Sequence, residues 1–110
     1  MIEFLTLLIF LVCAHFVCDF PLQGDFVAKF KARIVDGKHN QFWIWVLTAH
    51  ATAHALPVLI LTKSLSLTSL MFITHWFIDL CKCEGRITFN QDQWLHLMVV
   101  FSIAVMGAWL

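Results

Sequence analysis

Four apolar stretches divide this chain, and each is close to the length of a membrane-spanning helix. Each has about 16 to 20 residues, at or slightly below the roughly 20 residues that cross about 30 Å of hydrocarbon. They predict helices over residues 4–20, 42–61, 65–80 and 94–110. Pro57 lies inside the second stretch, where we expect it to kink the helix. The pattern predicts an all-α fold, an integral membrane four-helix bundle that forms a single domain over residues 1–110.

The longest connection, between the first two stretches, has an amphipathic pattern of its own. Its apolar side chains share one helical face and are Phe26, Val27, Phe30 and Ile34. Its basic side chains fall outside that face and are Lys29, Lys31 and Arg33. This arrangement predicts a short interfacial helix over about residues 25–34, lying on the membrane with its basic groups toward anionic lipid headgroups. Residues 35–38 contain Asp-Gly and should then turn the chain back.

Composition supports a membrane environment for this single domain. Hydrophobic residues make up 61 % of the 110 residues, charged residues make up 13 %, and the mean hydropathy is +0.85. A soluble domain is typically about half apolar and about a quarter charged. The net charge is zero, so the chain lacks the basic surplus typical of nucleic-acid binding. The lipid bilayer is the expected partner, no nucleic acid is expected, and the small size is compatible with a homo-oligomer.

Lysine and arginine are concentrated in the first and third connections, and this asymmetry predicts the orientation. The first connection holds Lys29, Lys31, Arg33 and Lys38. The third holds Lys82 and Arg86, whereas the opposite side has only Lys63. Short loops rich in Lys and Arg stay in the cytoplasm. We therefore expect a multi-pass protein of the bacterial inner membrane, with these two loops cytoplasmic and both termini outside.

Each apolar stretch also carries, within it or at its start, two ionisable side chains four residues apart. The pairs are His15 with Asp19, His50 with His54, His75 with Asp79, and Asp92 with His96. Residues four apart lie on one face of a helix, so each helix can direct its pair toward a common axis. At about 1.5 Å per residue, six of the eight fall within roughly 10 Å of the cytoplasmic surface. The pair on the second stretch lies somewhat deeper.

Imidazole and carboxylate side chains in this pattern point to a metal centre. A carboxylate inside a membrane helix costs about 2.5 to 3.5 kcal/mol, and a bound cation offsets that cost. The ligand set suits Zn, Mn or Fe, as one ion or two. The candidate metal ligands are His15, Asp19, His50, His54, His75, Asp79, Asp92 and His96. The alternative is a polar network that only joins the helices by hydrogen bonds. Gln23 and Gln93 flank the site and can support its ligands.

The same motifs resemble a known family. They are residues 14–23 (AHFVCDFPLQ), residues 28–29 (AK), the pair His50 and His54, residues 74–79 (THWFID), and residues 92–97 (DQWLHL). In this combination they resemble the domain-of-unknown-function 3307 family of small bacterial and phage membrane proteins. The resemblance covers nearly the whole chain. It implies a membrane location and a shared polar site, and it implies no activity.

These observations favour a metal-dependent hydrolase acting on a phospholipid or phosphoester at the cytoplasmic face. In that hypothesis His50 is a ligand or a base, and Asp92 is a bridging ligand or the general base. An ion or proton transporter is the alternative, with His54 and Pro57 continuing a path to the far side. Haem ligation by paired histidines fits less well, because the aspartates would have no use there. A structural membrane protein that binds a partner remains a fourth hypothesis.

Overall fold

The protein is all-α apart from one small hairpin, as the sequence predicts. The structure, a computed structural model, describes residues 3–109. Its elements are α1 (Phe4–Asp19), α2 (Gly24–Phe30), β1 (Ile34–Val35), β2 (Lys38–His39), α3 (Trp43–Thr62), α4 (Leu65–Cys83) and α5 (Phe89–Trp109).

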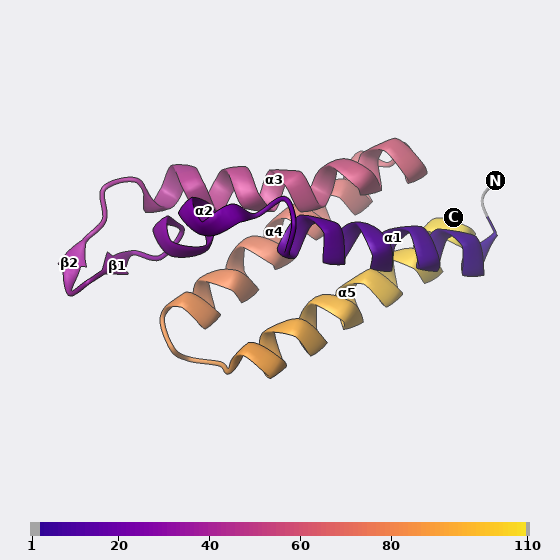
Figure 1. Ribbon diagram of the computed structural model, residues 1–110. Helices are drawn as coiled ribbons and strands as arrows, with labels where there is room; N and C mark the ends of the chain where they lie inside the picture. Colours follow the sequence, from indigo (N-terminus) through magenta and orange to yellow (C-terminus); the bar gives the residue numbers. More distant parts are fainter. Residues whose placement is uncertain (1–2, 110) are drawn as a thin grey trace.

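The long helices pack side by side into an elongated bundle (Figure 1). Helix α1 contacts α3 and α5, and α4 contacts the same two helices, so these four elements close a ring around one core. The molecule measures 48 × 23 × 23 Å. Both termini lie at one end of the bundle, and the hairpin and the α4–α5 connection lie at the other (Figure 1). All four helices therefore contribute residues to each end.

Two of the helices meet the length and apolarity expected of a membrane span. They are α3, with 20 residues, and α5, with 21 residues. Helix α1 passes the same test only together with α2, and an 84° bend separates the two. Large apolar side chains such as Ile9, Trp45, Ile60, Ile73 and Met98 are exposed on the outside of the bundle. These features favour a membrane location.

Helices α4 and α5 are longer than predicted. Helix α4 continues to Cys83, and α5 begins at Phe89, five residues before the predicted start at 94. A capping box fixes the start of α5, because the Gln91 N–H donates to Thr88 Oγ1 (3.1 Å) and the Thr88 N–H donates to Gln91 Oε1 (2.9 Å). Asp92 therefore lies in the first turn of α5 rather than before the helix.

The predicted interfacial helix is shorter than expected. Helix α2 ends at Phe30, and Ile34 lies in strand β1 instead of on the helix face where we predicted it. Asp36 and Gly37 have φ values of 52° and 78°, the left-handed pair that a type I′ turn requires. The predicted turn at residues 35–38 is thus confirmed, as the loop of a two-stranded hairpin. The chain forms a hairpin here and does not continue the helix, because the Asp-Gly sequence strongly favours this turn.

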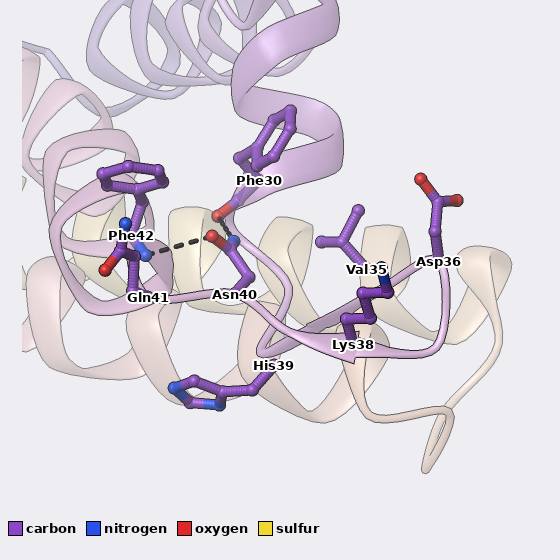
Figure 2. Close-up of a pocket in the computed structure, with 8 residues that line it drawn as sticks. All are labelled: Phe30, Val35, Asp36, Lys38, His39, Asn40, Gln41 and Phe42. Atoms are coloured by element: carbon purple, nitrogen blue, oxygen red, sulfur yellow. Dashed lines mark hydrogen bonds between the residues drawn. The ribbon is translucent and has the colours of Figure 1, made fainter.

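One buried asparagine connects the hairpin to the helices on either side of it. The Asn40 side-chain NH₂ donates to the carbonyls of Phe30 (2.6 Å) and Ala32 (3.0 Å), and its Oδ1 accepts from the Phe42 N–H (3.0 Å). Figure 2 shows this residue among those that line an open pocket of about 650 Å³, which also include His39. His39 is exposed on the hairpin.

The interior of the bundle differs between its two ends. Toward the termini it is apolar, and this apolar half is formed by Leu7, Leu11, Ala55, Val58, Leu67, Met71, Val100, Ile103 and Ala104. Toward the hairpin the buried side chains are mostly ionisable. This polar half is formed by His15, Asp19, His50, His54, His75, Asp79, Asp92 and His96. The polar half contains the candidate site.

Candidate metal centre

All eight predicted site residues are buried and face the interior of the bundle. Each of the four long helices contributes one of the predicted pairs, and none of the eight side chains lies on the outer surface. The shared helix face expected from the four-residue spacing is therefore present in every helix. The structure nevertheless does not place the eight residues equivalently, because they form three groups with different partners.

The first group brings four potential metal ligands close together. One potential ligand atom from each of Asp19, His50, His54 and His75 lies within 4.8 Å of the other three. These atoms come from three helices: α1 supplies Asp19, α3 supplies both His50 and His54, and α4 supplies His75. Ligand atoms around one tetrahedral ion with bonds of about 2.1 Å are about 3.4 Å apart. The four atoms are therefore near each other but farther apart than the ligands of a bound ion.

Asp19 is the centre of this group. Its Oδ1 is hydrogen-bonded to Nε2 of His50 (3.1 Å) and to Nε2 of His54 (2.9 Å). Its Oδ2 accepts from the side-chain NH₂ of Gln93 (2.8 Å). Its neighbour on the same helix, His15, is farther away, with Nε2 3.6 Å from Oδ2. The four-residue spacing thus aims the side chains correctly, but the contacts form between helices.

His75 has no hydrogen-bond partner on either ring nitrogen, although it is only 1 % exposed. Its ring stacks between those of His54 and His96, with centroid distances of 3.7 Å and 4.1 Å. A buried polar atom without a partner costs about 1 to 3 kcal/mol, and native folds rarely tolerate one. One nitrogen held in this way fits a bound ion, because a neutral imidazole offers a single lone pair and its other nitrogen carries a proton.

The second group is centred on Asp79, whose partners are lysines. Lys31 Nζ lies 2.8 Å from Asp79 Oδ2, and Lys82 Nζ lies 3.4 Å from Oδ1. Lys31 also donates to the side-chain carbonyl of Gln23. We predicted Lys31 on the headgroup side of an interfacial helix, and that prediction is wrong, because Lys31 is buried. Helix α2 ends one residue earlier, so Lys31 is free to turn inward instead of following the helix face.

The third group lies on α5. Asp92 Oδ1 is 3.1 Å from Nε2 of His96, and its Oδ2 accepts from the Gln93 side-chain NH₂ (3.2 Å). The Gln93 side-chain oxygen in turn is 3.2 Å from Nε2 of His15. Gln93 therefore joins this group to Asp19, and its predicted place beside the site is confirmed. Its proximity in sequence to Asp92 was the only signal for this role.

The polar half holds one more carboxylate than it has ammonium groups. It has three carboxylates, and among residues 3–109 both of the lysines that form ion pairs there contact the same one, Asp79. Asp19 and Asp92 pair only with imidazole and amide groups in this part of the chain. With neutral imidazoles one negative charge is left over. A divalent ion near Asp19 would more than offset this single charge and would also give one ring nitrogen of His75 a partner.

Comparison with known proteins identifies a family but no function. No curated protein and no solved structure matches the chain. A family model described as "Protein of unknown function (DUF3307)" matches residues 7–110, a span that contains all eight predicted site residues. The chain therefore belongs to the DUF3307 family.

Proposed function

We propose that this protein is a membrane-embedded metal-binding protein that holds a divalent ion at Asp19, His50, His54 and His75. The observation that carries the proposal is His75, buried with two unpaired ring nitrogens beside a carboxylate and two further imidazoles. A set of imidazoles with one carboxylate suits Zn, Mn or Fe. A polar network that only joined the helices would be expected to pair fully buried ring nitrogens, so the unpaired nitrogens of His75 support an ion.

The proposal places all four long helices across the inner membrane, with the hairpin end in the cytoplasm. The apolar side chains on the outside of the bundle support this placement, because a bilayer would cover them. Exposed basic groups support the orientation, since Lys29, Arg33, Lys38 and Arg86 lie at the hairpin end and Lys63 lies at the other. Lys29 and Lys38 could also contact anionic headgroups.

The reaction we propose for the centre is hydrolysis of a phosphoester or phospholipid at the cytoplasmic face. A bound ion lowers the pKa of its water toward 7 and polarises a phosphoryl oxygen. Asp92 is the proposed general base, because it lies outside the four-residue ligand group yet connects to Asp19 through Gln93. His50 remains a ligand in this scheme.

Transport is the less favoured function. A proton or ion path would have to continue from His54 through the half of the bundle nearer the termini. That half is filled by apolar side chains, among which Val58 and Ile103 are fully buried. Polar groups that could relay an ion are absent from this described core. Chemistry at the cytoplasmic end therefore fits the geometry better than a path across the bilayer.

Elemental analysis of the full chain, purified in detergent without chelators, tests metal binding. We expect about one divalent ion per chain in the wild type and a loss of at least tenfold in metal affinity in His75→Ala. His39→Ala is the matched control, because His39 is exposed on the hairpin and should leave the metal unchanged. Equal metal in His75→Ala and the wild type would contradict the proposed site.

Hydrolysis needs a separate test, because an ion could be bound without catalysing anything. With phosphatidic acid vesicles and a soluble phosphomonoester as substrates, Asp92→Asn should retain the ion and lose at least about 100-fold in rate, the scale of a general base. A metal-loaded wild type that hydrolyses neither substrate would refute hydrolysis of these substrates and leave the metal site standing.

A further inference from the structure

We infer that Lys31 limits this centre to a single divalent ion, because its ammonium group occupies the position that a second ion would take at Asp79. The inference rests on the proposed metal site and adds to it the residue that sets the number of ions. It is carried by the burial of Lys31, by its contact with Asp79, and by the distances from Asp79 to the ligand group.

Asp79 lies directly against the four-residue ligand group but is not part of it. Its Oδ2 is 3.6 Å from Nε2 of His50 and 3.9 Å from Nε2 of His75. In two-metal sites the ions are about 3.5 to 4 Å apart and neighbouring side chains serve both. The oxygens that hold the Lys31 ammonium group are Asp79 Oδ2 and the side-chain carbonyl oxygen of Gln23. Without Lys31, these two oxygens would be available to a second ion, with water completing its coordination.

Lys31 takes up the charge of Asp79 that such an ion would use. Its Nζ is 2.8 Å from Oδ2, the same oxygen that faces His50 and His75. Lys82 contacts the other oxygen at 3.4 Å. An ammonium ion bound to a carboxylate at this distance repels a divalent cation from the same oxygen, since like charges so close together in a low-dielectric interior interact strongly.

The burial of Lys31 shows that the contact is a built feature of the fold. Lys31 is only 2 % exposed, although it follows a short helix outside the four-helix ring. Removing an ammonium group from water is unfavourable unless an opposite charge and hydrogen bonds compensate. Asp79 supplies the charge, and the side-chain carbonyl of Gln23 supplies a hydrogen-bond acceptor. A solvated surface lysine would satisfy neither condition.

Counting bound ions in three variants tests the inference. Lys31→Met keeps the length and apolar stem of the side chain and removes its charge. We expect the wild type to bind one divalent ion per chain, Lys31→Met to bind two, and the double variant Lys31→Met, Asp79→Asn to bind one. Lys29→Met is the matched control, because Lys29 is 53 % exposed and pairs with Asp36 at the surface. It should bind one ion. All four proteins are measured in the same detergent after equilibration with Zn²⁺ or Mn²⁺.

The outcomes separate this inference from the proposed function. One ion in both the wild type and Lys31→Met would overturn the inference and leave the metal site intact. No ion in the wild type would overturn both. If Lys31→Met does not fold, Asp79→Asn in the wild-type background decides. Retention of the single ion supports the inference, because Lys31 already keeps Asp79 from binding metal, and loss of the ion overturns it.

Discussion

The two halves of the bundle are equally well buried, yet they are stabilised in opposite ways. Val58 and Ile103 in the apolar half are 0 % exposed, and His75 and Asp92 in the polar half are 1 % exposed. The apolar half needs only close packing, which every apolar neighbour can supply. The polar half needs a specific partner for each atom, and for Asp19 those side-chain partners come from α3 and α5. Burial alone therefore does not identify a site; the degree to which buried polar atoms are satisfied does.

The largest effect should follow from placing a charge in the apolar half. Val58→Asp introduces a carboxylate into the closely packed apolar core, and we expect a loss of about 3 kcal/mol or more in the free energy of unfolding. Unfolding by SDS in mixed micelles, followed by circular dichroism, measures it. Val58→Ala is the control for lost volume and should cost about 1 to 2 kcal/mol. Equal losses would show that the apolar half tolerates charge.

Gln93→Ala should produce the next largest effect, in the polar half. The side chain donates to both Asp19 and Asp92, so its removal leaves two buried carboxylates with fewer partners. We expect a loss of about 1 to 3 kcal/mol in the same unfolding measurement. Gln91→Ala is the matched control. Gln91 lies at the exposed start of α5, and its loss should cost under about 1 kcal/mol. A smaller effect for Gln93 than for Gln91 would contradict its bridging role.

His75→Leu should be nearly neutral when a chelator is present. No hydrogen bond of His75 is lost, and an apolar side chain replaces two unpaired nitrogens, so we expect a change within about 1 kcal/mol in either direction. His54→Leu, which breaks a hydrogen bond to Asp19, should cost about 1 to 3 kcal/mol under the same conditions. If the two variants lose the same stability, His75 has a partner that the structure does not assign.

The smallest effect should come from Gly107→Ala in α5, at the terminal end of the apolar half. A Cβ there would lie 2.9 Å from Leu7 Cδ2 and 3.2 Å from Thr62 Cγ2. The leucine methyl group can move, and alanine favours helix by about 1 kcal/mol, so the net loss should stay below about 1 kcal/mol. Thermal unfolding in detergent measures it, with the exposed Ser102→Ala as control. A loss above about 2 kcal/mol would show that the packing there cannot adjust.

The sequence predicts those features that depend on one helix at a time. Apolar runs locate the helices, and the four-residue spacing places His15 with Asp19, or His75 with Asp79, on one inward face. Both signals are local, because they follow from helix geometry alone. The capping box at Thr88 is also a local sequence signal, and it marks the start of α5. The apolar pattern alone placed that start later, at residue 94.

Contacts between distant segments could not be predicted in the same way. The pairing of Lys31 with Asp79 joins residues 48 positions apart, and no spacing rule relates them. The separation of the eight site residues into three groups has the same origin. Which histidine reaches Asp19 depends on how α1, α3 and α5 are rotated against one another, and periodicity leaves that rotation undetermined.

The very short connection between α3 and α4 also bears on how the proposed centre would be assembled during synthesis. Only Lys63 and Ser64 separate the two helices, so in the proposed membrane placement they would enter the bilayer as an antiparallel pair. This pair carries His50, His54 and His75 before the ribosome has finished α5. An ion captured at that stage, with Asp19 already inserted, would act as a template onto which the last helix folds.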